Sequence, residues 1–149
     1  MAEPSLYNSN SARLGNGRKL ALHALWIGLI ASGAAWLVLH YFVLVKGEFG
    51  PEHSPYEPMS LKVHGGLAFL ALWFGGMMWG THMLKAWSQK RRRWTGTILL
   101  LIFALMIVSG YLLYYAGDEG LRANVSLIHW VVGLAIPVMY LLHRLVKRF

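Results

Sequence analysis

Two histidines near the end of the chain, His129 and His143, have a spacing that suits two metal centres on one helix. They lie fourteen residues apart in the apolar segment LIHWVVGLAIPVMYLLHR. At about 100° per residue, fourteen steps return to within about 40° of the starting direction, so both imidazoles share one helix face. At about 1.5 Å rise per residue they are roughly 21 Å apart, one near each edge of a bilayer core about 30 Å thick. The spacing therefore predicts two metal levels, one above the other.

The composition is typical of a membrane protein. Of the 149 residues, 56% are hydrophobic and only 13% are charged, where a soluble domain carries about 25% charged residues. Seven Trp and seven Tyr fit the aromatic belts found at membrane surfaces. The sequence contains no cysteine, which excludes disulfides, cysteine-ligated iron–sulfur clusters and haem attached through thioethers. A net charge of +8 could suit a nucleic-acid partner. The basic residues, however, cluster at the ends of apolar runs, so we expect no nucleic-acid partner.

Four apolar runs are long enough to cross a bilayer, which takes about 20 residues. They cover residues 20–45, 61–87, 94–115 and 125–146. Short turns at 88–93 and 116–123 make consecutive spans antiparallel neighbours, and the proline-containing segment 46–60 is expected to be an irregular surface loop. We therefore expect an all-α integral membrane protein, an up-down bundle of four transmembrane helices at 20–149 that follows a polar N-terminal tail at 1–19. Pro137 is expected to bend the fourth span.

The lysines and arginines predict how the bundle lies in the membrane. Eleven of the fourteen fall on the side of the termini and the 88–93 turn, and only Lys46, Lys62 and Arg122 fall on the other side. Cytoplasmic loops carry the excess of Lys and Arg in membrane proteins. Both termini are therefore expected to be cytoplasmic, with membrane lipid around the bundle.

This topology sorts six of the seven histidines into two layers. A single histidine near a helix end is usually an interfacial residue bonded to water or lipid, but two layers of three favour a shared function. Neutral imidazole is an axial ligand of haem iron, and two imidazoles from different helices would clamp one haem in the bundle. No Asp or Glu falls within the expected spans, which disfavours a metal-ion transporter or a proton pump. The inner layer holds His23, His82 and His143, and the outer layer holds His40, His64 and His129.

Several motifs resemble one known family. In the fourth span His129 and His143 form a His-x3-Gly-x9-His pattern, the second span opens with VHGG at 63–66, and the third contains IVSG at 107–110 without a histidine. Over roughly residues 20–144 the chain resembles the four-helix di-haem cytochrome b superfamily, in particular the cytochrome b membrane subunits of respiratory formate dehydrogenase and nickel–iron hydrogenase. The segment RWTGT at 93–97 departs from the formate dehydrogenase type, since it shares only the glycine of an Asn–Gly segment that helps to form the quinol pocket.

The resemblance implies two stacked haem b groups, each with two histidine ligands. The implied ligands are His23 and His143 for the inner haem, and His64 and His129 for the outer haem. His40 and His82 are less suitable. The rise along the helix places His82 roughly one turn beyond the level of His143, near a quinone pocket or a haem propionate. Arg18 and Arg144 are candidates to contact the propionates of the inner haem.

The resemblance also implies a function in the bacterial inner (cytoplasmic) membrane. The multi-pass chain would carry electrons between the quinone pool and a periplasmic partner, a dehydrogenase or a cytochrome c. It would act as an electron-transfer subunit of a quinone-linked oxidoreductase, with no catalytic domain of its own. The alternative from another class is a haem-free four-span scaffold or a small transporter. The sequence leaves open whether the chain forms a homo-oligomer.

Overall fold

The described part of the chain is helical apart from one short β-hairpin and the connecting segments. A computed structural model describes residues 15–90 and 93–145. Helix α1 covers Asn16–Phe42, and strands β1 (Leu44–Lys46) and β2 (Pro51–His53) follow it. Helix α2 (Glu57–Met78) continues through a π-helical turn, η1 (Trp79–Met83), into α3 (Leu84–Ser88). Helices α4 (Arg93–Tyr115) and α5 (Glu119–Leu145) complete the chain.

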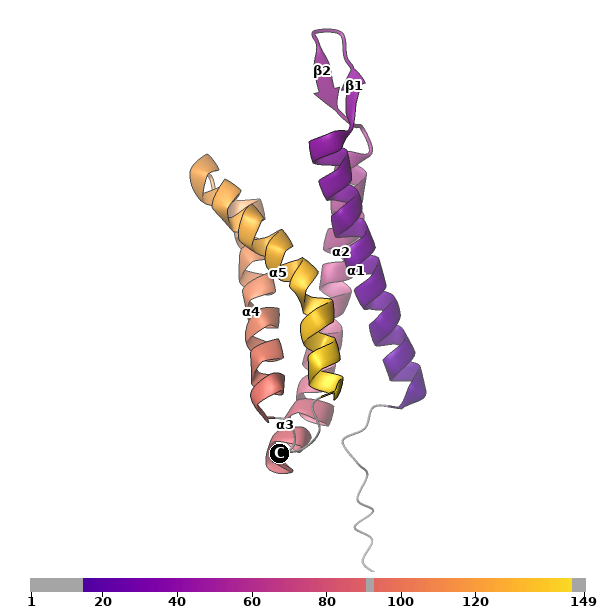
Figure 1. Cartoon of the computed structure of the whole chain (residues 1–149), viewed down its shortest axis with the longest axis vertical. Helices are drawn as coiled ribbons and strands as arrows, with labels where there is room; N and C mark the ends of the chain where they lie inside the picture. Colours follow the sequence, from indigo (N-terminus) through magenta and orange to yellow (C-terminus); the bar gives the residue numbers. More distant parts are fainter. Residues whose placement is uncertain (1–14, 91–92, 146–149) are drawn as a thin grey trace, which may run out of the picture.

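The prediction of four long apolar helices is confirmed. By length and composition α1, the continuous segment Glu57–Ser88, α4 and α5 could each cross a membrane. Helix α1 begins at Asn16, so the end of the predicted polar tail is helical, while residues 1–14 lie outside the described part. The start of α1 and the end of α5 lie at one end of the molecule, and the β1–β2 hairpin lies at the other (Figure 1). This is the up-down order that short connections dictate.

Besides α1, helices α2 and α5 begin several residues earlier than the hydropathy predicts. Helix α2 begins at Glu57, where a proline stands in the first turn, a position at which the missing N–H is harmless. Helix α5 begins at Glu119 because the Asp118 carboxylate accepts the backbone N–H of Leu121 at 2.6 Å, which caps the helix. The expected turn at 116–123 therefore shortens to three residues, and Glu57 belongs to a membrane-length helix rather than to a loop.

The predicted loop at 46–60 contains regular structure that its prolines did not indicate. Strands β1 and β2 pair in antiparallel register, with Leu44 opposite His53 and Lys46 opposite Pro51. Gly50 has a φ of 134°, a backbone conformation that glycine adopts without strain. The hairpin carries His53 back toward the end of α1, which matters for the second histidine cluster described below.

The helices pack as two hairpins. Helix α1 packs along α2 and helix α4 packs along α5, whereas the hairpins meet mainly along α1 and α5 (Figure 1). Among the described residues only Val125 and Ile136 are buried apolar side chains. Apolar side chains facing outward are expected of helices surrounded by lipid. The interface between the hairpins, by contrast, carries several of the polar side chains considered next.

Two irregularities alter the simple helix arithmetic. Helix α5 runs through Pro137 without ending, and its axis changes direction along its length in Figure 1, as an internal proline predicts. The π turn η1 begins at Trp79 and contains His82, where the expected level of His82 assumed an unbroken α-helix. Because a π turn closes with wider i→i+5 bonds, the α-helical rise and rotation do not hold over the residues just before His82, and its level relative to His143 stays a prediction.

Candidate functional site

His64 on α2 is oriented by helix α1. Its Nδ1 lies 3.0 Å from the Ser32 Oγ and 3.1 Å from the backbone carbonyl oxygen of Leu29. The Ser32 hydroxyl itself donates to the Gly28 carbonyl at 2.7 Å. A carbonyl oxygen can only accept, so Nδ1 carries the ring proton and donates it. The Nε2 of His64 therefore keeps its lone pair and is available as a ligand.

His129 on α5 is oriented in the same way by helix α4. Its Nδ1 lies 2.8 Å from the Ser109 Oγ, and the Ser109 hydroxyl donates to the Leu105 carbonyl at 2.7 Å. With the hydroxyl proton directed at the carbonyl, the oxygen accepts the Nδ1 proton of His129. This imidazole also presents an unprotonated Nε2. Such a bond from the second ring nitrogen is typical of histidines that bind metals.

A glycine follows each of these serines and lets the imidazole approach the facing helix. A Cβ at Gly33 would lie 3.2 Å from the Cε1 of His64, and a Cβ at Gly110 would lie 3.5 Å from the Cε1 of His129. The first distance is shorter than ordinary carbon contacts, which lie near 3.5–4.0 Å. The serine thus holds the ring nitrogen while the glycine leaves room for the ring edge.

The two imidazoles meet between the helical hairpins. The ring centroids of His64 and His129 are 6.2 Å apart, with an angle of 76° between the ring planes. A metal–imidazole bond is about 2 Å long and a ring nitrogen lies about 1 Å from its centroid, so two imidazoles on opposite sides of one metal ion have centroids about 6 Å apart. We call His64 and His129 the outer histidine pair. Because both rings are held through Nδ1, the Nε2 atoms are the nitrogens left to bind a metal, and the centroid distance makes the pair a candidate to bind one ion together.

His143, further along α5, also faces a hydroxyl residue followed by a glycine on α4. Its Nδ1 lies 2.8 Å from the Thr95 Oγ1, and a Cβ at Gly96 would lie 3.7 Å from its Cε1. Thr95 precedes Ser109 by fourteen residues on α4, and His143 follows His129 by fourteen residues on α5. Equal steps on antiparallel neighbours bring each histidine opposite its own hydroxyl. The spacing of the two histidines is therefore matched by the spacing of their hydrogen-bond partners.

His23, near the start of α1, contacts α5 near the end of that helix. Its Nε2 lies 3.2 Å from the Tyr140 hydroxyl, and the guanidinium of Arg144 lies 5.8 Å from the centre of the Tyr140 ring. Tyr140 stands about one helical turn before His143. The contact that the structure describes for His23 is thus with Tyr140, and ligation of one metal by His23 and His143 together stays a prediction.

An apolar cavity of about 340 Å³ lies between α1 and α5 beside His23. Isoleucine, tryptophan and leucine side chains form most of its wall, with Pro137. The polar groups at its edge come from His23, Tyr140 and Arg144. A mostly apolar cavity with a few converging polar groups is the usual form of a small-molecule site.

The remaining predicted residues lie elsewhere. Arg18 is exposed in the first turn of α1, and His82 is half-buried within η1. His40, near the end of α1, bonds to Glu57 and belongs to a separate cluster.

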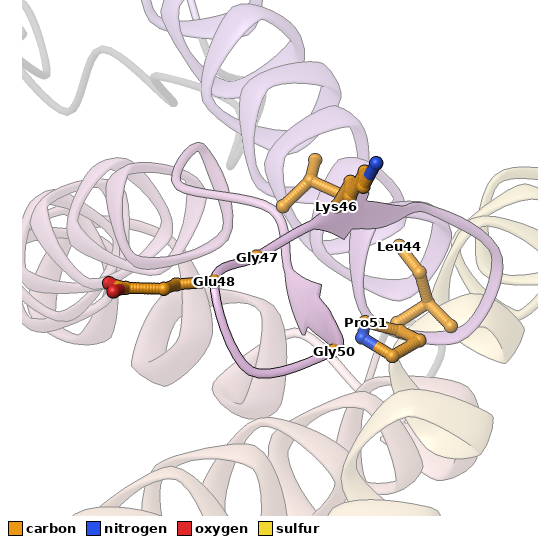
Figure 2. A pocket seen from close by; sticks show the side chains of 7 residues that line it. Leu44, Lys46, Gly47, Glu48, Gly50 and Pro51 are labelled. Carbon is orange, nitrogen blue, oxygen red and sulfur yellow. The ribbon is translucent and has the colours of Figure 1, made fainter.

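A further hollow of about 590 Å³ lies on the β1–β2 hairpin, residues 44–51 (Figure 2). Its charged side chains, Lys46 and Glu48, project away from each other in Figure 2. Because its polar groups do not converge on a common point, this hollow has no feature of a binding site.

The sequence reasoning missed the hydroxyl residues Ser32, Thr95 and Ser109. Their signal was present as a repeated dipeptide: each is followed directly by glycine in an apolar segment. Ser32 and Ser109 are buried polar residues, 8% and 3% exposed, and a buried hydroxyl in an apolar helix requires a partner. Comparisons with protein-family models, with curated proteins and with solved structures gave no match, so the geometry of the site carries the functional proposal.

Proposed function

We propose that this protein is a membrane electron carrier that holds two b-type haems. The observation that carries the proposal is the outer histidine pair, in which two neutral imidazoles from different hairpins meet with both Nδ1 atoms held by serines. Haem iron takes neutral imidazole as its axial ligand. The centroid separation of 6.2 Å supports His64 and His129 as the two residues that would hold one haem.

The donor set favours haem over other metal groups. Two imidazoles with no carboxylate and no thiolate are too few for a closed tetrahedral zinc site, which takes four ligands. Haem supplies four ligands of its own and needs two from the protein.

The inner level supports the second haem. We propose His143 and His23 as its ligands, with the His143 imidazole held through Nδ1 by Thr95. The cavity beside His23 lies between the hairpins at this level. We propose that Arg144, at the cavity edge, would neutralise a propionate, and that Arg18, in the first turn of α1, would have the same role.

A bound haem supplies one-electron oxidation and reduction. Ser32 and Ser109 fix the tautomer and the orientation of His64 and His129, and Thr95 orients His143 through its Nδ1. Hydrogen bonds of this kind raise the basicity of a ligand and help to set the potential. The apolar helices keep water from the site. We propose that electrons pass between a quinone at the inner end and a redox protein at the end that carries the β1–β2 hairpin. We further propose that the chain lies in a bacterial inner membrane with both termini cytoplasmic.

The first test is the visible spectrum and the haem content of the purified full-length protein. We expect a Soret band, an α-band on reduction, and two haems per chain. His129→Ala is expected to remove the outer haem alone, and His143→Ala the inner haem alone, leaving one haem per chain in each case. Thr97→Ala is a matched control, since Thr97 bonds only the Arg93 carbonyl on its own helix and should leave two haems.

Two outcomes would overturn the proposal. A colourless protein, purified from cells supplied with haem, would favour the haem-free scaffold or transporter instead. Two intact spectral components in His129→Ala would show that His129 is no ligand. If the variant binds neither haem, adding free imidazole tests whether folding is the cause, because imidazole restores the outer component only when the rest of the site is formed.

A further inference from the structure

A second cluster of potential ligands lies outside the proposed haem sites, at the end of the molecule that carries the hairpin. His40 comes from the end of α1, His53 from β2 and Glu57 from the first turn of α2. One ligand atom from each residue lies within 4.8 Å of the other two. Three elements that are separated by loops therefore bring three potential ligands to one point.

The carboxylate of Glu57 is the centre of this cluster. The Nδ1 of His40 lies 2.8 Å from the Glu57 Oε1, and the Nδ1 of His53 lies 3.3 Å from the Glu57 Oε2. The two imidazole rings are stacked, with centroids 4.8 Å apart and an angle of 2° between their planes. Both Nδ1 atoms thus face the same carboxylate from neighbouring parallel rings.

Trp36 supports the cluster from the preceding turn of α1. Its indole N–H donates to the Glu57 Oε1 at 3.1 Å, and its ring stacks on His40 with centroids 4.7 Å apart. These contacts fix both the carboxylate and one imidazole. Groups that orient ligands in this way are typical of metal sites, where they set the position of the donor atoms.

One oxygen of the cluster lacks a hydrogen bond. The Glu57 Oε2 is buried, in a side chain that is 14% exposed, and accepts no hydrogen bond from the described residues. The His53 Nδ1 lies 3.3 Å away but does not have the geometry of a hydrogen bond. A buried carboxylate oxygen without a donor is costly. A cation held by the three donors would give the Glu57 carboxylate a partner of opposite charge.

We propose that His40, His53 and Glu57 bind one divalent cation of the zinc class. Two imidazole nitrogens and a carboxylate oxygen are a ligand set that Zn²⁺ takes with one further position left open. The side chain of His53 is 57% exposed, so ions and water reach the cluster from solvent. The ion joins the end of α1, the β1–β2 hairpin and the start of α2, and it holds the hairpin against the helix ends.

The test is a titration of the full-length protein in detergent with Zn²⁺, after a chelator has removed bound metal. Calorimetry is expected to give one high-affinity site per chain, and X-ray absorption is expected to show two imidazole ligands. Glu57→Gln and His53→Ala should each weaken zinc binding by about 100-fold or more, since even loss of an indirect contact costs about 10- to 100-fold. Glu48→Gln, in the same hairpin, removes an equal charge and should bind zinc as the unchanged protein does.

The proposal fails if no zinc binds, or if the variants bind zinc as tightly as the control does. His53 is an exposed residue of the hairpin, so His53→Ala tests the site with little risk to folding. The haem spectrum of each variant gives an independent check, because it reports the outer and inner histidines and not this cluster. A protein that binds zinc without haem would overturn the proposed function alone, and a haem protein without zinc would overturn this inference alone.

Discussion

The hydroxyl of Ser109 is the most informative single group to remove. In Ser109→Ala the Nδ1–H of His129 loses an acceptor at 2.8 Å, in a place where Ser109 is only 3% exposed. Leaving a buried donor unpaired costs about 1–3 kcal/mol. At about 1.4 kcal/mol for each factor of ten, the affinity of the outer haem should fall by about 5- to 150-fold.

The same change should alter the potential of the outer haem. A bond from Nδ1–H makes the ligand more basic and so favours the oxidised iron. Its loss should move the midpoint potential upward, by about 59 mV for each tenfold change in the ratio of oxidised to reduced binding. The inner haem, whose proposed ligand His143 is held by Thr95, should keep its potential.

The assay combines haem content with a redox titration followed in the α-band. Ser109→Thr retains a hydroxyl and should keep most of the outer haem, while Thr97→Ala removes a hydroxyl on the same helix that bonds only a backbone carbonyl. If Ser109→Ala matched Thr97→Ala in both haem content and potential, the serine would not orient a ligand, and the reasoning on the tautomer would be refuted.

The glycines give further predictions. Gly33→Ala should reduce the outer haem content, because its Cβ would lie 3.2 Å from the His64 imidazole. Gly110→Ala should be tolerated, because its Cβ would lie 3.5 Å from the His129 imidazole. Equal haem contents in the two variants would contradict this prediction. Gly75→Ala would bring a Cβ within 2.8 Å of the Phe103 ring and should lower the free energy of unfolding by about 1–3 kcal/mol. Thermal unfolding in detergent checks this against Gly76→Ala, which meets nothing within 4 Å; equal midpoints would show that the ring moves aside freely.

The number of helices and the order in which they run could be predicted from the sequence. Hydropathy is a local property, and about 20 apolar residues suffice to mark a span. Helix ends were predicted less well, because they depend on single side chains such as the Asp118 carboxylate and the proline in the first turn of α2. The hairpin at 44–53 was missed because its strands are three residues each, too short to show a period.

The sequence by itself also placed His64 and His129 at one depth, since residue number along a span is a measure of depth. That their rings lie 6.2 Å apart was decided only by the tertiary structure, because facing depends on how the two hairpins are rotated and packed. The same holds for Ser109 and Thr95, which reach His129 and His143 through the register of α4 against α5. Periodicity fixes the face of one helix, but only packing fixes which face of a neighbour it meets.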